Sequence, residues 1–122
     1  AGVWILFQQG TATIQSPEQL QGVRRISELL HQLDDTAHLS GATVILEITG
    51  QTDVVGRSSR NQRLSEDRAR SVLDALHPAT FSAITFHARG IGPAPESSPS
   101  LDATTLPQDR RVSFQATVHP AS

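Results

Sequence analysis

The chain has no cysteine and no lysine, and aromatic residues make up only 4% of its 122 residues. Without cysteine it has no disulfide, no thiolate metal site and no cysteine nucleophile. No run approaches the roughly 18–20 apolar residues that a membrane-spanning helix needs, and no signal peptide is visible after Ala1. Because aromatics are scarce, the core must be built from Val, Ile, Leu and Ala together with the four Phe.

Charge does not predict a nucleic-acid or membrane partner. The net charge is −2, and five arginines fall between Arg57 and Arg70. Acidic residues are interspersed among these arginines, and no aromatic accompanies them for base stacking. We interpret the stretch as a solvated helix face, with Arg57, Arg60 and Arg63 as alternative contacts to a glycan or peptide at the rim of a groove. We expect no nucleic acid and no direct membrane insertion.

Signatures of catalysis and of cofactor binding are missing. The five histidines are scattered without metal-ligand spacing, so we expect no metal site. Residues 90–92 (Gly-Ile-Gly) lack the third glycine of a dinucleotide fingerprint. Serine, histidine and aspartate are available for a triad, but no Gly-x-Ser-x-Gly elbow is present. We therefore expect a protein that is not an enzyme and has no cofactor.

The first half of the chain predicts a strand and a long helix. Residues 3–7 are a short apolar run of strand formers. A helix should follow, because Ser16 fits the N-cap, Pro17 the first helical position and Gln19 the capping box. We expect it to end near residues 34–41. Five apolar residues at helical spacing form its core-facing stripe: Leu20, Val23, Ile26, Leu30 and Leu33.

The second half predicts three more strands and one more helix. Residues 43–49 alternate apolar and polar, as a strand with one buried face does. A polar loop over residues 50–60 should precede a helix from about Gln62 to His77, which Pro78 stops. Strands are expected at residues 81–88 and 111–118, joined by a Pro- and Ser-rich surface loop over residues 90–109.

This β-α-β-α-β-β order predicts an α/β (α+β) two-layer sandwich with one mixed sheet. Right-handed crossovers would place both helices on the same face of that sheet. The other face should be open and mostly polar, with Trp4 offered to a neighbouring domain or to a second copy of the chain. We assign to this face Trp4, Leu6, Ile45, Glu47, Thr85, Ser113 and Gln115.

The residues that can carry chemistry join the second predicted strand to the second predicted helix. Asp53 comes just past the strand, and Arg68 lies roughly two turns into the helix. In open α/β sheets, ligands tend to bind beyond the carboxyl ends of strands. An Asp–Arg pair is more often a structural salt bridge. If the loop holds the two charges apart, they present a carboxylate and a bidentate guanidinium to one zwitterion.

Two motifs in this stretch resemble a known family. Gly-x-Thr-Asp at residues 50–53 and Asn-x-x-Leu-Ser-x-x-Arg-Ala-x-x-Val at residues 61–72 look like the signature of the OmpA-like peptidoglycan-binding domain. That family includes peptidoglycan-associated lipoproteins and the periplasmic domains of flagellar stators. Looser likenesses extend to Phe7, to residues 13–14, to residues 90–92 and to Asp-Arg-Arg-Val at residues 109–112. The resemblance covers nearly the whole chain.

The resemblance implies non-catalytic, non-covalent binding of peptidoglycan, which tethers a larger envelope protein to the cell wall. Asp53 and Arg68 would hold the side-chain ammonium and carboxylate of meso-diaminopimelate in the stem peptide. The expected binding set is completed by Asn61, Arg110, Thr52 and Gln8. Residues 1–122 are then a single OmpA-like domain, the excised C-terminal part of a larger protein. We expect it in the periplasm or cell envelope of a Gram-negative bacterium.

Three positions depart from the family pattern. Gln8 stands where the family has an acidic residue, Gln51 replaces a histidine, and Asp109 replaces a closing asparagine that precedes Arg110. A neutral amide accepts a hydrogen bond but does not neutralise an ammonium. An alternative is therefore an OmpA-like fold with a weakened wall site, acting as a protein-interaction or oligomerisation module through the face that carries Trp4.

Overall fold

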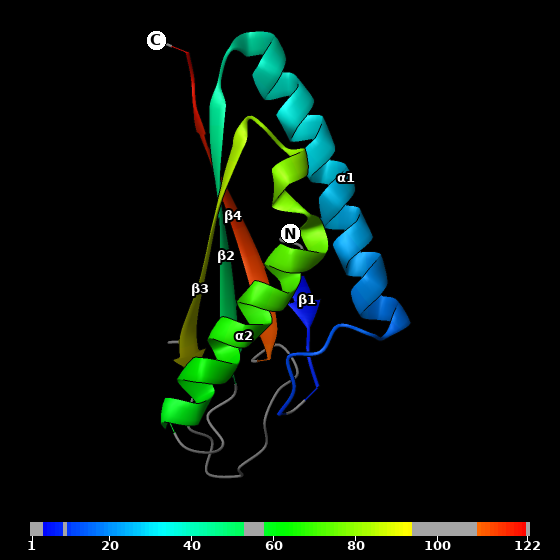
Figure 1. Ribbon diagram of the computed structural model, residues 1–122, viewed down its shortest axis with the longest axis vertical. Helices are drawn as coiled ribbons and strands as arrows, with labels where there is room; N and C mark the ends of the chain where they lie inside the picture. The colour runs from blue at the N-terminus through cyan, green and yellow to red at the C-terminus, as the bar shows by residue number, and fades with distance from the viewer. Residues whose placement is uncertain (1–3, 9, 53–57, 94–109, 122) are drawn as a thin grey trace.

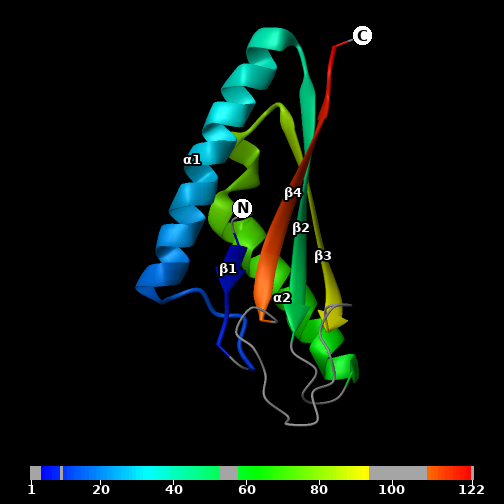
Figure 2. The ribbon, with the colours of Figure 1, turned by 180° about the vertical axis from the view of Figure 1, so that it is seen from behind.

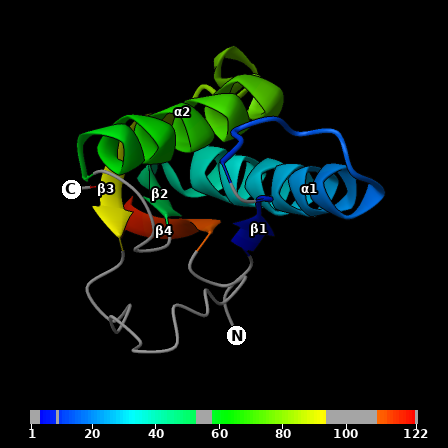
Figure 3. The same cartoon turned by 90° about the horizontal axis from the view of Figure 1, so that it is seen from below.

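The computed structural model describes residues 4–8, 10–52, 58–93 and 110–121. In these residues the order is β1 (Trp4–Leu6), α1 (Pro17–Ser40), β2 (Thr43–Thr52), α2 (Ser58–Leu76), a 3-10 turn (Pro78–Thr80), β3 (Ile84–Pro93) and β4 (Arg111–His119). Both helices cover the same face of one four-stranded sheet (Figures 1 and 3). The predicted two-layer α+β fold with a mixed sheet is confirmed.

The sheet has the strand order β1-β4-β2-β3. β2 runs parallel to β3, whereas β4 is antiparallel to both β1 and β2. β4 therefore separates β1 from β2, although it is the last strand in the sequence (Figure 2). The predicted faces are confirmed: Val44, Leu46 and Ile48 are buried under the helices, while the residues assigned to the open face are partly or fully exposed.

Helix α1 begins as the sequence predicts. The backbone N–H of Gln19 donates to the Ser16 hydroxyl, and the Gln19 side chain completes the capping box. Ile26 and Leu30 are buried as expected. Leu20 is an exception, because 51% of it is exposed. The inward stripe therefore starts at Val23, a turn later than predicted.

Several element boundaries differ from the prediction, and β2 continues through Thr52 into the expected polar loop. α2 begins at Ser58 rather than near Gln62. The prediction missed its first turn because that turn is polar and carries no apolar periodicity. β3 begins at Ile84 rather than at Phe81, because Pro78 opens a 3-10 turn. β3 also continues through residues 90–93, which we expected in the surface loop. The rest of that loop, residues 94–109, lies outside the described residues.

Two glycines explain why β2 and β3 continue so far beneath α2. A Cβ on Gly50 would lie 2.0 Å from the Ser65 carbonyl oxygen, and a Cβ on Gly90 would lie 2.3 Å from the backbone nitrogen of Glu66. The helix therefore rests directly on the strand backbones. Ser65 secures this contact, since its hydroxyl donates to the Gln62 carbonyl and accepts from the N–H of Gly92 at 2.9 Å. Residues 61–68 of α2 are thereby fixed beside the end of β2.

Candidate functional site

Those predicted site residues that the structure describes gather at the end of the molecule where β2 stops and α2 starts, at the bottom of Figure 1. The segment that leads from β1 to α1 passes the same end, as the view from below shows (Figure 3). Thr52 ends β2, Asn61 and Arg68 lie on α2, and Gln8 follows β1. Asp53 and Asp109 lie outside the described residues.

Arg68 lies at the centre of this end and is only 1% exposed. Its Nε donates to the Thr11 carbonyl at 2.8 Å, its Nη1 to the Gln51 carbonyl at 3.0 Å and its Nη2 to the Gln8 carbonyl at 2.9 Å. The guanidinium also lies over the Phe7 ring, 5.4 Å from its centroid. Arg68 therefore lies buried at the base of the site rather than exposed at its surface, and it links α2 to β2 and to the connection between β1 and α1.

Two neighbours of Arg68 extend this buried polar region. Asn61 is 5% exposed and precedes Arg68 by seven positions, so both lie on the sheet-facing side of α2. Thr52 is 1% exposed, and its hydroxyl has no hydrogen-bond partner among the described residues. The Oε1 atom of Gln51 is also buried without a partner in that part of the chain. Because native proteins pair nearly all buried polar atoms, unpaired acceptors at a strand end favour a ligand site.

Gln8 and Arg110 lie on the other side of this end. Both line a groove between β1 and the start of α1, which we name the β1–α1 groove. Gln8 has an exposed side chain, although its carbonyl accepts from Arg68. Arg110 precedes β4, and its Nε donates to the Phe7 carbonyl at 3.0 Å. The six predicted residues thus divide between a buried cluster (Thr52, Asn61 and Arg68), this groove (Gln8 and Arg110) and the undescribed Asp53.

The predicted binding set does not include four other residues that contribute to this end of the molecule. Thr11, Gln51 and Phe7 act through backbone carbonyls or a ring face, for which no sequence signal exists. Glu18 lines the β1–α1 groove with Gln8 and Arg110. Its position beside Ser16 marked it only as a helix-start residue.

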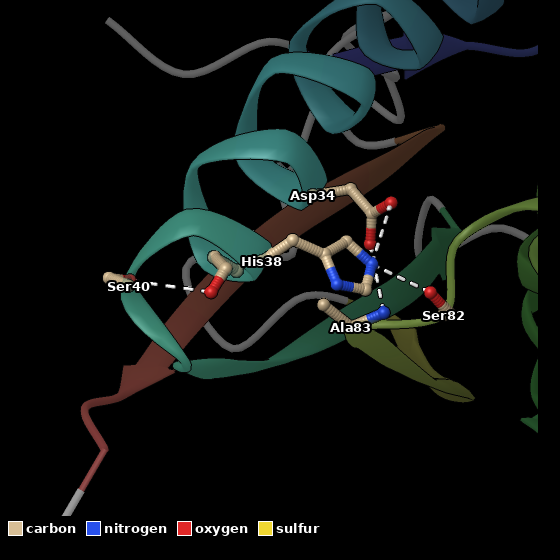
Figure 4. A network of polar contacts seen from close by, with 6 residues as sticks. Asp34, His38, Ser40, Ser82 and Ala83 are labelled. Carbon is tan, nitrogen blue, oxygen red and sulfur yellow. Dashed lines mark hydrogen bonds and ion pairs between the residues drawn. The ribbon is translucent and has the colours of Figure 1, made fainter.

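A serine, a histidine and an aspartate meet at the far end of α1, but not as a catalytic relay. The Nε2 atom of His38 lies 2.7 Å from the Ser82 hydroxyl and 3.6 Å from Oδ2 of Asp34 (Figure 4). A relay needs the serine and the aspartate on different ring nitrogens. Here both face the same nitrogen. Oδ1 of Asp34 accepts from the backbone N–H of Ala83 at 2.9 Å, so the cluster attaches α1 to the start of β3.

The described residues hold no group of three or more His, Cys, Asp or Glu side chains that could bind a metal ion. In the same part of the chain, no helix is both long and apolar enough to cross a membrane.

A model of the OmpA family matches residues 6–105. The chain belongs to the OmpA family. Outer membrane protein A of Klebsiella aerogenes is 38% identical over 123 residues, a match that covers 91% of this chain and 32% of that protein. Outer membrane protein A of Serratia odorifera is 36% identical over 96 residues, covering 79% of this chain and 37% of that protein. The chain thus spans about a third of the length of these curated relatives.

Solved structures of OmpA-like domains have the same fold. The peptidoglycan-associated lipoprotein from Burkholderia pseudomallei matches with a TM-score of 0.66 at 19% identity, over 93% of this chain and 89% of that chain. The C-terminal domain of Helicobacter pylori MotB matches with a TM-score of 0.68 at 18% identity, over 93% of this chain and 83% of that chain.

Proposed function

We propose that this chain binds bacterial peptidoglycan reversibly and without catalysis, through the diaminopimelate of the stem peptide. It would act as the wall-binding domain of a longer envelope protein in the periplasm of a Gram-negative bacterium. The observation that carries this proposal is the meeting of Gln8, Thr52, Asn61 and Arg68 at one end of the sheet. Membership of the OmpA family and the peptidoglycan association named for a structural neighbour support it.

Asp53 and Arg68 are the residues proposed to bind the two opposite charges of the diaminopimelate side chain. Asp53 directly follows Thr52 in the sequence and would face the ligand's ammonium. Arg68 would attract the ligand's carboxylate from below, since a buried charge is weakly screened by salt. Its contacts with the Gln8, Thr11 and Gln51 carbonyls also set the walls of the site. The unpaired Thr52 hydroxyl is available for a polar atom of the ligand.

The test is co-sedimentation with purified peptidoglycan. The chain should sediment with diaminopimelate-type walls and much less with lysine-type walls, because a lysine stem residue lacks the side-chain carboxylate. Asp53→Asn should weaken sedimentation on the order of tenfold, since it removes one charge-assisted contact. Asp35→Asn is the matched control, because Asp35 is exposed on α1 far from the site. Equal sedimentation of the wild-type chain with both wall types would contradict the proposed ligand.

A second candidate function is an interaction or oligomerisation module. The observation that favours it is the pair Trp4 and Leu6, which are 45% and 41% exposed on the open face of β1. Arg111 lies over the Trp4 ring at 4.7 Å, which presents a flat apolar and cationic surface. Concentration-dependent mass by light scattering, abolished by Trp4→Thr and unaccompanied by wall binding, would favour this function over the first.

A further inference from the structure

The open face of the sheet carries polar side chains in rows that cross the strands, on the side away from both helices (Figure 3). One row runs over all four strands, because its members lie opposite one another in the register of the sheet. Residues that pair across strands share a face. Each member is partly or fully exposed. We name it the Trp4 row, and it consists of Trp4, Ser113, Thr49 and Arg89.

A second row lies two residues nearer the start of β2. We name it the Glu47 row, and it consists of Gln115, Glu47 and His87. Gln115 and His87 are exposed, and Glu47 is partly exposed. In the described part of the chain, none of these three side chains makes a hydrogen bond or an ion pair. The Glu47 row therefore presents an amide, a carboxylate and an imidazole to solvent across two strand spacings, about 10 Å.

Trp4 stands at the edge of these rows, and its ring is held from one side. The guanidinium of Arg111 lies over the ring, 4.7 Å from its centroid. Along β4, Arg111 lies on one side of Ser113, the partner of Trp4, and Gln115 lies on the other side. The ring is 45% exposed although Arg111 covers one of its faces. We assign the exposed area to the opposite face, which turns toward Gln115.

The composition of this face favours one kind of partner. A nucleic acid needs an excess of positive charge, whereas here Arg89 and Glu47 offset each other. A protein interface needs an apolar centre, and beyond β1 the two rows have none. An uncharged oligosaccharide fits better. Its hydroxyl and amide groups can pair with the polar side chains, and the apolar side of a sugar ring can pack on an indole. The sheet face of the OB-fold binds oligosaccharides too.

We propose that the open face binds the uncharged glycan strand of the cell wall, with a sugar ring against Trp4 and its polar groups on the Glu47 row. The choice of the wall glycan rests on the proposed function. The Trp4 row crosses β2 at Thr49, three residues before Thr52, which is about 10 Å along the strand. Diaminopimelate is the third residue of a stem peptide, and three extended residues span about the same length. One stretch of wall then reaches both the open face and the buried cluster.

Titration with chitotetraose tests this proposal, because that compound is an uncharged oligomer of N-acetylglucosamine without any peptide. Trp4 is the only tryptophan of the chain, so a change in tryptophan emission reports from this face alone. The wild-type chain should show a saturable change in emission. A free stem peptide that carries no sugar should leave the emission unchanged. Unchanged emission with chitotetraose would overturn the proposal.

Calorimetry of variants separates a binding role from a structural one. Gln115→Ala should weaken chitotetraose binding on the order of fivefold, because a hydrogen bond to the sugar is lost. It should leave the unfolding midpoint unchanged, since the Gln115 side chain has no hydrogen bond within the described residues. Trp4→Ala should weaken binding further. Gln32→Ala, at an exposed glutamine of α1 in the other layer, is the matched control and should change neither value. Equal affinities of the wild-type chain, Gln115→Ala and Trp4→Ala would overturn the assignment of this face.

The glycan contact and the stem-peptide site can fail separately. A chain that sediments with diaminopimelate-type walls but does not bind chitotetraose would overturn the open-face proposal and leave the proposed function standing. A chain that binds chitotetraose through Trp4 and Gln115, yet sediments equally with diaminopimelate-type and lysine-type walls, would support the open-face proposal and contradict the proposed stem-peptide ligand.

Discussion

The Nη2 atom of Arg68 donates a 2.9 Å hydrogen bond to the carbonyl oxygen of Gln8, so α2 holds the chain just beyond β1. Together with the bonds to Thr11 and Gln51, this contact makes Arg68 a structural residue as well as a proposed binding residue. Loss of wall binding by an Arg68 variant is therefore informative only when folding is measured beside it.

Arg68→Lys should destabilise the fold by about 2–4 kcal/mol in its free energy of unfolding. Lysine keeps the charge, but its ammonium is a point donor that cannot reach three carbonyls held by a planar fork. Buried carbonyls that lose their partner then carry a desolvation cost. Urea denaturation measures the change, with the exposed Arg63→Lys on the same helix as control. Equal urea midpoints for Arg68→Lys and Arg63→Lys would show that the planar guanidinium of Arg68 is not needed to hold the three carbonyls in place.

Thr52→Val should stabilise the free protein by about 1 kcal/mol. The Thr52 hydroxyl is buried without a partner in the described part of the chain, and valine has nearly the same shape without that oxygen. The proposed site predicts the opposite effect on wall binding, which should weaken because a ligand atom loses its acceptor or donor. Thermal unfolding and co-sedimentation of the same preparation give both values. A variant that is less stable than wild type would mean that the hydroxyl already contributes to the folded state.

Gly50→Ala should be severely destabilising, by roughly 3 kcal/mol or more, because its Cβ would collide with the Ser65 carbonyl oxygen. Backbone of both β2 and α2 would have to move, with loss of packing around the site. Gly22→Ala is the contrasting change. Its Cβ would lie 3.3 Å from Cγ1 of Ile5, a tight contact rather than a collision with backbone, and alanine is favoured over glycine inside a helix. Gly22→Ala should therefore lower the unfolding midpoint far less than Gly50→Ala, as guanidinium denaturation can measure.

Asp34→Ala should cost about 1–3 kcal/mol, because the buried N–H of Ala83 loses its acceptor at the start of β3 (Figure 4). Asp34→Asn should cost much less, since its amide oxygen can accept the same bond. His38→Ala should change the free energy of unfolding by no more than about 0.5 kcal/mol, because surface contacts of this kind contribute little. Chemical denaturation of the three variants checks this order. A larger loss for His38→Ala than for Asp34→Ala would contradict it.

Much of the fold could be predicted from local patterns. The capping box at Ser16, the alternation of residues 43–49 and the stop at Pro78 each depend on neighbouring residues only. The position of β4 inside the sheet could not be predicted, because it depends on pairing between residues far apart, such as Ile48 with Phe114. The extension of β3 through Gly90 was missed for a similar reason. Glycine after a strand usually predicts a turn, and only the approach of α2 explains its role here.

The site shows the same division between local and long-range information. Charge and spacing identified Arg68, the family resemblance added Asn61 and Thr52, and the structure brings all three to one end of the sheet. The burial of Arg68 beside three backbone carbonyls was not predicted. Every residue has a backbone carbonyl, so the sequence does not indicate which ones accept hydrogen bonds from Arg68. The position of Glu18 in the β1–α1 groove depends on the bond from Gln19 to the Leu6 carbonyl, a contact across the β1–α1 connection.

The place of β4 between β1 and β2 determines the order in which the molecule can assemble. β2, α2 and β3 are consecutive and can fold as a local unit while the chain is still being made or moved. β1 has no strand to pair with until β4 arrives, although it is the first strand in the sequence. Contacts of such long separation slow folding. The segment that carries Gln8 should accordingly be among the last to reach its native place, and the binding end of the molecule should form only when folding is complete.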